Sequence, residues 1–426
     1  MNEHDSEKIA GILTELGYIP AEEIADADLV LFNTCCVREN AELKLYGNVG
    51  ALKAKKRKKH DMIIAVCGCM MQEDGAAKKL AQTFPFIDII FGTNSMQELP
   101  QMVYSAKKLG KRTVIENRPF GDIIEDILVR RNVSPLAYVN IMQGCNNFCS
   151  YCIVPYVRGR ERSRKPDDIV NEVKGLVRDG FKEVMLLGQN VNSYGKGTDT
   201  DFPTLLKRGA EETGIPRIRF MTSPPKDISE ELLHVMASHD NITKQLHLPV
   251  QSGSDRVLAE MNRRYTREHY LGLIKRAKEL MPECSLSTDV IVGFPGETDE
   301  EFEETMSLME EVRYDAAYMF VYSKRAGTKA AEMPCQISDE VKKERITRLV
   351  NRQNDIVYEN NLKKVGTEQL VLVEGHSKRS SEDFCGRTDD GRMVNFPYDG
   401  SMDITGKILR VKITEAKRST LMGEII

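Results

Sequence analysis

Short apolar runs alternate with amphipathic helical patterns through most of the chain, and this alternation predicts parallel sheets covered by helices. Near the start, apolar residues between Ile9 and Leu16 recur at helical spacing, and Gly17 ends the pattern. Strand-like runs with helices between them follow at residues 29–32, 62–66 and 87–91. We therefore expect residues 1–105 to form an α/β domain with an open parallel sheet.

Residues 131–361 repeat the alternation of strand and helix and are expected to form a larger domain. Strands are predicted at residues 137–142, 183–187, 218–222, 245–249, 287–292 and 317–322. These units correspond to an incomplete (β/α)6 barrel, open on one side for a large substrate. A long helical pattern over residues 338–364 indicates a packing helix that leads out of the barrel.

The last stretch, residues 364–426, is rich in short strands, which are predicted at residues 369–374, 384–387, 393–396 and 407–414. Asp389-Asp390-Gly391 is typical of a hairpin turn. Short strands with basic loops predict a small all-β barrel that holds RNA. The basic loop residues are Lys378, Arg379, Lys417 and Arg418. A module that only packs against the rest of the chain is the alternative.

Composition narrows the class of protein without identifying a partner. The 426 residues are 41% hydrophobic and 29% charged, as in ordinary globular proteins, and the net charge of −4 neither marks nor excludes a nucleic-acid binder. No apolar run approaches the roughly 20 residues of a membrane span, and the polar residues 1–5 are unlike a signal peptide. Ten cysteines, some bunched, indicate metal thiolates in a reducing compartment, so we expect a cytoplasmic protein without a membrane partner.

The strongest chemical signal is the stretch from Cys145 to Cys152, where three cysteines have the spacing CxxxCxxC. Three thiolates on a short loop can hold a 4Fe–4S cluster and leave one iron open. An open iron can bind S-adenosylmethionine (SAM), and an electron from the cluster can then break a carbon–sulfur bond of SAM to give a radical. We predict that Cys145, Cys149 and Cys152 are the catalytic cluster ligands, shielded from water by Phe148 and Tyr151. The alternatives are three ordinary buried thiols or a structural zinc site, but zinc sites usually close with four ligands, and no Cys or His follows at a matching spacing.

Polar residues also follow several predicted strands of the larger domain, at the rim where barrel active sites are built. Among them, Gln189, Ser223 and Gln251 are expected to bind SAM. Residues 158–164 contain four arginines, which fit phosphate or carboxylate binding at this rim better than a solvated surface.

Thiols also follow the strands of the first domain, where ligand sites of open parallel sheets lie. We expect Cys35 and Cys69 to be ligands of a second metal cluster, whereas Cys36 and Cys67 are more simply small buried residues. The basic run at residues 53–60 is expected to end a helix, with binding of RNA phosphates as a second choice.

With these motifs the chain resembles the methylthiotransferases of the radical-SAM superfamily, and most closely their MiaB type. The resemblance covers nearly the whole chain, with an N-terminal methylthiotransferase domain, a radical-SAM core and a C-terminal TRAM domain. The stretches that carry it are residues 33–39, 68–70, 145–163, 186–195, 247–254 and 293–297. Residues 186–195 separate the MiaB type from its relatives.

The resemblance implies that adenosine 37 of a tRNA, already carrying an isopentenyl group, gains a methylthio group at C2. This C–H bond is neither acidic nor activated, so radical chemistry suits it. The implied cofactors are SAM and two 4Fe–4S clusters, with Cys145, Cys149 and Cys152 on the SAM-cleaving cluster and Cys35 and Cys69 on the auxiliary cluster. The implied partners are the tRNA anticodon arm, gripped by the TRAM domain, and an electron donor such as flavodoxin or ferredoxin. The chain is expected to be a monomer.

The chain departs from the family pattern at its first residues. The family's auxiliary cluster has three cysteine ligands, the first in a segment ending Cys-Gln-Met-Asn-Glu, whereas this sequence begins with Met1-Asn2-Glu3. We expect that cysteine, and the first strand of the sheet, to lie upstream of Met1. One alternative function is methylthio transfer to threonylcarbamoyladenosine in tRNA or to a ribosomal protein, which residues 189–192 argue against. Another is an iron–sulfur RNA-binding form that cleaves SAM without transferring a methylthio group.

Overall fold

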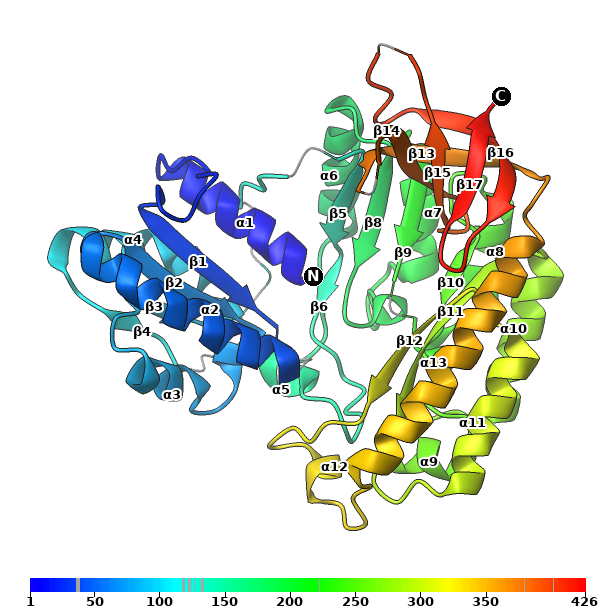
Figure 1. The fold of residues 1–426 in the computed structure, drawn as a ribbon, viewed down its shortest axis with the longest axis horizontal. Helices are drawn as coiled ribbons and strands as arrows, with labels where there is room; N and C mark the ends of the chain where they lie inside the picture. Colours follow the sequence, from blue (N-terminus) through cyan, green and yellow to red (C-terminus); the bar gives the residue numbers. More distant parts are fainter. Residues whose placement is uncertain are drawn as a thin grey trace. The chain divides into compact units, whose positions relative to one another are not determined.

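The structure is a computed structural model of residues 1–426 (Figure 1). It describes all residues except 36–38, 117–118, 122, 124, 126, 132–133, 222, 379 and 401, together with the side chains of 39–41 and 381. Cys36, Thr222 and Arg379, which the sequence patterns singled out, lie outside the described residues. Contacts divide the chain into a first unit, residues 1–132, 143–147 and 152–162, and a second unit, residues 133–142, 148–151 and 163–426.

The first unit is built on a parallel sheet with the strand order β1-β2-β3-β4. The strands are β1 (Leu29–Thr34), β2 (Ile63–Gly68), β3 (Ile89–Phe91) and β4 (Thr113–Val114). The helices are α1 (Asn2–Glu15), α2 (Glu39–Lys58), α3 (Ala76–Thr83), α4 (Leu99–Leu109) and α5 (Val154–Arg158), with 3-10 turns η1 (Cys69–Gln72) and η2 (Thr93–Glu98). The prediction of an open parallel sheet is confirmed, and the two-residue strand β4 is an addition to it.

Helices cover both faces of this sheet, which explains why its central strands are continuous apolar runs. In β2, Ile64 and Val66 pack into one apolar cluster, while Ile63 and Ala65 pack into another. The basic run ends helix α2 as predicted, with Lys55 to Lys58 in the last turn.

The described part of the second unit contains six parallel strands, β5 (Leu136–Asn140), β8 (Glu183–Leu187), β9 (Arg217–Phe220), β10 (Gln245–His247), β11 (Ser285–Val292) and β12 (Ala316–Val321). They form the sheets β5-β8-β9 and β10-β11-β12, and a parallel bridge between Ile218 and Ile242 lies at their junction. The larger helices are α6 (Pro166–Arg178), α7 (Phe202–Glu212), α8 (Glu230–Ser238), α10 (Arg267–Leu280), α11 (Asp299–Val312) and α13 (Asp339–Leu362). The shorter elements are β6 (Met142–Gln143), β7 (Arg162–Ser163), η3 (Val191–Ser193), η4 (Pro225–Asp227), α9 (Asp255–Glu260) and α12 (Lys329–Glu332). This arrangement confirms the incomplete (β/α)6 barrel.

The six strands separate an apolar face from a mostly polar one, because successive side chains of a strand point to opposite sides. Leu246, Leu286 and Val290 belong to the largest apolar cluster, together with residues of α10, α11 and α13. The residues next to them along the strands point to the other side, which we call the inner face. Its polar and aromatic members are Tyr138, Asn140, Glu183, Arg217, Arg219, Gln245, His247, Ser285, Ser287, Asp289, Tyr318 and Phe320.

The C-terminal strands close a small barrel in the order β13-β14-β15-β17-β16. The strands are β13 (Glu368–Ser377), β14 (Ser380–Thr388), β15 (Met393–Pro397), β16 (Ile408–Ala416) and β17 (Leu421–Ile425). Its core contains Val371, Phe396, Val411 and Leu421. The prediction of a small all-β barrel is confirmed, although strand β17 was not predicted. The turn at Asp389 to Gly391 lies between β14 and β15 as expected, with Gly391 at φ 85°.

Two buried arginines on the inner face hold this turn against the amino-terminal ends of the barrel strands. Arg219 donates to the carbonyls of Thr388 and Asp389 at 2.7 and 3.0 Å, and Arg217 donates to the carbonyl of Arg387 at 3.0 Å. Glu183 lies between the two guanidinium groups, 2.7 Å from Arg219 Nε and 3.4 Å from Arg217. The small barrel is therefore fixed to the larger one by buried charge.

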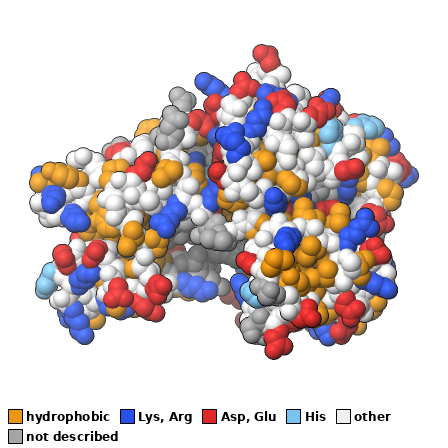
Figure 2. Space-filling view, turned by 90° about the horizontal axis from the view of Figure 1, so that it is seen from above, with side chains coloured by type: hydrophobic (Ala, Val, Ile, Leu, Met, Phe, Trp, Pro, Cys, Tyr) orange, Lys and Arg blue, Asp and Glu red, His pale blue; other side chains and the backbone are white. Residues whose placement is uncertain are grey.

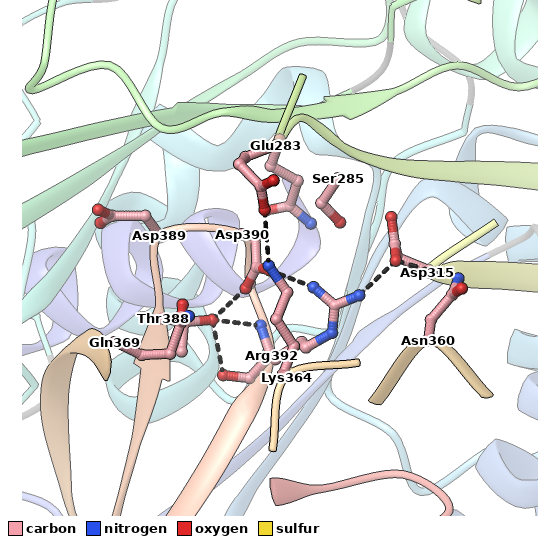
Figure 3. Close-up of polar contacts among 12 residues, drawn as sticks. Glu283, Ser285, Asp315, Asn360, Lys364, Gln369, Thr388, Asp389, Asp390 and Arg392 are labelled. Carbon is pink, nitrogen blue, oxygen red and sulfur yellow. Dashed lines mark hydrogen bonds and ion pairs between the residues drawn. The ribbon is translucent and has the colours of Figure 1, made fainter. Parts of the chain in front are cut away.

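A second polar cluster joins the same turn to the segment just after α13 and to the residue just before β12 (Figure 3). Arg392 pairs with both Asp390 and Asp315, and Lys364 lies 3.3 Å from Asp390 and 3.2 Å from Glu283. Burial by itself raises the pKa of Asp390, but the charges of Arg392 and Lys364 hold it below its ordinary value. Asp390 is therefore a buried carboxylate whose negative charge is balanced.

The surface carries charges of both signs. Figure 2 shows basic and acidic side chains interspersed over the face drawn there, in keeping with the net charge of −4. In the part of the chain that the structure describes, no helix is both long and apolar enough to cross a membrane.

Candidate functional site

The predicted cluster cysteines lie on the loop that joins β6 to α5. Gly144 opens this loop at φ 81°, and a Cβ atom there would lie 2.0 Å from the carbonyl oxygen of Arg160, so only glycine fits. The amide of Cys145 donates to the carbonyl of Gly159 at 3.1 Å. The start of the loop is thus fixed against the segment that follows it.

The middle of the loop, residues 148–151, is anchored within the second unit. The amide of Ser150 donates to the carbonyl of Met261 at 3.1 Å, and its hydroxyl donates to the carbonyl of Glu260 at 2.7 Å. Asn262 donates to the carbonyl of Phe148 at 2.9 Å. Phe148 itself has a φ of 48°, an uncommon conformation for a non-glycine residue, which these contacts hold in place. The backbone around Cys149 is therefore set by the last residue of α9 and the two residues after it.

The donor set on this loop fits a 4Fe–4S cluster with one open iron. Cys145, Cys149 and Cys152 are half-buried, and every cysteine that the structure describes is a thiol rather than part of a disulfide. Three thiolates within eight residues leave one iron of a cube for SAM. Among the described residues, no group of three or more Cys, His, Asp or Glu side chains is drawn together as around a metal ion, so the ligand sets stay predictions.

The residues predicted to bind SAM follow three neighbouring strands of the second unit. Gln189 follows β8, Ser223 follows β9 and Gln251 follows β10. Ser223 is fully buried, and its hydroxyl has no hydrogen-bond partner among the described residues. Gln251 has a φ of 74° and is bridged to β11, because its amide donates to the carbonyl of Asp289 at 2.8 Å.

Buried polar groups without partners indicate that this rim receives a polar ligand, because such groups are almost always satisfied in folded proteins. Besides Ser223, the side-chain amide of Asn192 is buried with no partner for its nitrogen or its oxygen among the described residues. Both fit a ligand as polar as SAM. Asn192 was noted in the sequence only as part of the family stretch and not as a binding residue. Glu297, at the same rim, is instead held by Arg345 at 2.7 Å.

In the first unit, Cys35 and Cys69 lie at the carboxyl edge of the sheet, as predicted. Thr34 and Gly68, the last residues of β1 and β2, are paired, so the residues that follow the two strands, Cys35 and Cys69, start from neighbouring positions. A Cβ atom at Gly68 would lie 2.2 Å from the carbonyl oxygen of Thr34, so glycine permits this close approach. Cys67 is buried, and its burial raises the pKa of its thiol well above the ordinary value. This favours the interpretation of Cys67 as a core residue.

Arg158 is a residue of this edge whose role the sequence patterns missed. Its Nε donates to Cys69 Sγ at 2.9 Å, and its guanidinium pairs with Asp5 at 2.5 Å. Burial by itself lowers the pKa of Arg158, but the negative charges of Asp5 and Cys69 raise it above the ordinary value, so the group stays charged. A cavity of about 240 Å³ lies beside Asp5 and Arg158 and is also lined by Lys8 and Arg162.

That the four arginines of residues 158–164 bind phosphate or carboxylate stays a prediction, although most of them have partners within the protein. Arg158 is engaged by Asp5 and Cys69, Arg162 donates to the carbonyl of Gly121, and Arg164 pairs with Glu172 at 2.7 Å. Three of the four therefore stabilise the fold around the cysteine loop. Arg160 is exposed.

Models of three protein families match successive parts of the chain. The uncharacterized protein family UPF0004 matches residues 1–92, the radical SAM superfamily matches residues 139–309, and the TRAM domain matches residues 362–426. Among solved structures, the radical S-adenosylmethionine methyltransferase TsrM from Kitasatospora setae is similar in fold, with a TM-score of 0.54 at 16% identity. The match covers 71% of this chain and 66% of that one.

Curated relatives match the chain from end to end. Proteins of Clostridium beijerinckii and Clostridium tetani, both named tRNA-2-methylthio-N(6)-dimethylallyladenosine synthase, are 50% identical over 100% of this chain and over 93% and 94% of their own lengths. A protein of Acetivibrio thermocellus with the same name is 50% identical over 89% of its length. The chain therefore belongs to the tRNA-2-methylthio-N(6)-dimethylallyladenosine synthase family of radical-SAM proteins.

Proposed function

We propose that the chain is a radical-SAM methylthiotransferase that adds a methylthio group to C2 of N6-dimethylallyladenosine at position 37 of tRNA. The observation that carries this proposal is the end-to-end match, at 50% identity, to relatives named for that product. The cysteine loop after the first strands of a six-stranded barrel supports the same chemistry.

Cys145, Cys149 and Cys152 would hold the cluster at which SAM is cleaved. When bound, a 4Fe–4S cluster with SAM supplies radical chemistry, which can break a C–H bond that acid–base catalysis does not reach. The chain contributes a fixed loop, because Ser150 and Asn262 anchor its backbone within the second unit. Gln189, Ser223 and Gln251 would orient SAM at the rim, with the buried amide of Asn192 as a further partner.

Cys35 and Cys69 would be ligands of an auxiliary cluster, which carries the sulfur to be transferred. The adjacent register of β1 and β2 supports this pairing. Arg158 would remain beside Cys69, where its positive charge favours the thiolate form that metal binding requires.

Each of three regions of the chain would have its own role. Residues 1–105 would hold the auxiliary cluster, residues 131–361 would carry the radical-SAM core, and residues 364–426 would bind the anticodon arm of tRNA. An electron donor such as flavodoxin or ferredoxin would reduce the SAM cluster, and the chain would act as a monomer in the cytoplasm.

Nucleoside mass spectrometry tests the proposal in cells that lack their own enzyme of this type. Expression of the chain should convert N6-dimethylallyladenosine in tRNA into its 2-methylthio derivative. The variant Cys149→Ala should abolish the product, whereas Cys335→Ser, which replaces an exposed cysteine outside the loop, should preserve it. A methylthio group on threonylcarbamoyladenosine instead, or cleavage of SAM with no methylthio product, would contradict the proposal and favour one of the alternative functions.

A further inference from the structure

Three neighbouring residues of the inner face lie on β10, β11 and β12, and two of them, Asp289 and Tyr318, are accessible to solvent. His247, Asp289 and Tyr318 point to the side opposite the helix-covered core, and Asp289 is paired in register with Tyr318. Tyr318 is 48% exposed, which is unusual for an aromatic residue in a strand of a barrel. This exposed surface calls for an explanation beyond the packing of the fold.

The histidine lies in contact with both of the other side chains. His247 is 5% exposed, and its Nδ1 lies 3.0 Å from the hydroxyl of Ser287. Its Nε2 lies 3.6 Å from a carboxylate oxygen of Asp289, and its ring meets that of Tyr318 edge-on, with 5.8 Å between the centroids. A buried histidine, held by Ser287, thus contacts both a carboxylate and a phenol ring that are exposed on the inner face.

The C-terminal barrel covers the part of the inner face next to these residues, toward the amino-terminal ends of the strands. Gln245, two residues before His247 on β10, accepts a hydrogen bond from Arg219, which also binds the carbonyls of Thr388 and Asp389. Gly391 packs so closely on Gln245 that an added Cβ would lie 2.8 Å from its amide. The turn between β14 and β15 therefore covers the inner face at the amino-terminal ends of the strands. The next residues along the strands toward their carboxyl ends are His247, Asp289 and Tyr318.

The chemistry of these residues fits a flat base that carries an N–H donor. An aromatic ring stacks on any nucleobase, and single-stranded RNA bases are commonly recognised by such stacking together with hydrogen bonds to their edges. A carboxylate accepts hydrogen bonds and repels anions, so these residues do not suit phosphate.

We propose that Tyr318 stacks on the target adenine and that Asp289, positioned by His247, accepts a hydrogen bond from its N6–H group. This inference rests on the proposed function and names the residues that recognise its substrate. N6-dimethylallyladenosine keeps one hydrogen on N6 and carries an uncharged substituent. Threonylcarbamoyladenosine carries a carboxylate, which Asp289 would repel, so the same residue also selects between the two modified bases.

The test measures binding of anticodon stem-loop RNAs to the reconstituted protein by fluorescence anisotropy. One RNA carries N6-dimethylallyladenosine and the other threonylcarbamoyladenosine, and SAM binding is measured on the same samples. Tyr318→Ala should weaken binding of the first RNA about tenfold, as expected for loss of one stacked base. Asp289→Asn should lower the ratio of the two affinities, first RNA over second, about tenfold, because the charge that repels the carboxylate of threonylcarbamoyladenosine is removed. Tyr358→Ala and Asp355→Asn, both on α13, are the matched controls and should change neither value.

The outcomes distinguish failure of this inference from failure of the proposed function. If Tyr318→Ala and Asp289→Asn bind both RNAs as the unmodified protein does, this inference is wrong while the proposed function stands. If both variants lose SAM binding in parallel with RNA binding, the three residues belong to the cofactor site and the inference is also wrong. If the unmodified protein itself does not prefer the dimethylallyl RNA and makes no methylthio product, the proposed function fails instead.

Discussion

Replacing Arg219 with methionine should loosen the small C-terminal barrel from the larger one. Arg219 is 3% exposed and donates to Glu183, to Gln245 and to the carbonyls of Thr388 and Asp389. Arg219→Met keeps most of the side-chain volume but leaves the Glu183 carboxylate buried with only Arg217, 3.4 Å away. Breaking one side of a buried ion pair costs about 3–5 kcal/mol, and the remaining arginine places this case near the lower value.

Hydrogen exchange measured by mass spectrometry reports the stability of each segment separately. A local measurement is needed because a chain of several domains need not unfold in one step. A cost of about 3 kcal/mol corresponds to roughly a hundredfold increase in the local opening of β9 and of the turn at residues 388–392. Arg276→Met is the matched control, because Arg276 pairs with Glu230 at the surface, where an ion pair contributes only about 0–1 kcal/mol.

A second substitution separates the buried charge from the rest of the interface. In the double variant with Glu183→Gln and Arg219→Met, no unpaired carboxylate remains, so part of the lost protection should return. If the amides of β9 and of residues 388–392 exchange no faster in Arg219→Met than in Arg276→Met, apolar contacts hold the interface together. The reasoning from buried charge is then refuted.

Three further predictions concern the second unit. Gly253→Ala should lower the melting temperature, because the added Cβ would lie 2.5 Å from a backbone oxygen of α11, whereas Gly272→Ala, in an open position of α10, should raise stability by up to about 1 kcal/mol. Tyr270→Phe should cost about 1–2 kcal/mol in thermal unfolding, because the hydroxyl donates to the carbonyl of Leu248 at 2.9 Å and accepts from the buried hydroxyl of Tyr314 at 2.8 Å. An unchanged midpoint would mean that the Tyr314 hydroxyl finds another acceptor. The depressed pKa of Asp390 contributes stability that is present above its ordinary value of 3.8 and is lost as the pH falls through its lower folded value. Asp390→Asn should therefore remove this part of the acid dependence of the melting temperature, and a variant with the same acid dependence would contradict the assignment.

The strands of the larger domain could be predicted because buried parallel strands are continuous apolar runs. The predicted run at residues 183–187 coincides with β8. The run predicted at residues 137–142 is instead divided between β5 and β6 at Ile141, where the chain turns toward the cysteine loop. Strand β17 escaped prediction because Gly423 and Glu424 break its apolar pattern.

The cysteine loop was visible in the sequence because its three thiols lie within eight residues, whereas the role of Arg158 was not. The partners of Arg158 lie 89 and 153 positions away, and no local pattern points to them. The same holds for His247, Asp289 and Tyr318, which come from three separate strands. Only the register of those strands places them together.

The contacts that dock the C-terminal barrel constrain the amino-acid sequence on one side of the interface more than on the other. Arg217 and Arg219 donate mainly to main-chain carbonyls of the barrel, at Leu370, Arg387, Thr388 and Asp389. A substitution changes a side chain but never removes a carbonyl, so the barrel can vary its surface residues, and with them its affinity for RNA, while it stays docked. The two arginines have no such freedom, because no other side chain offers several fixed donors in one plane.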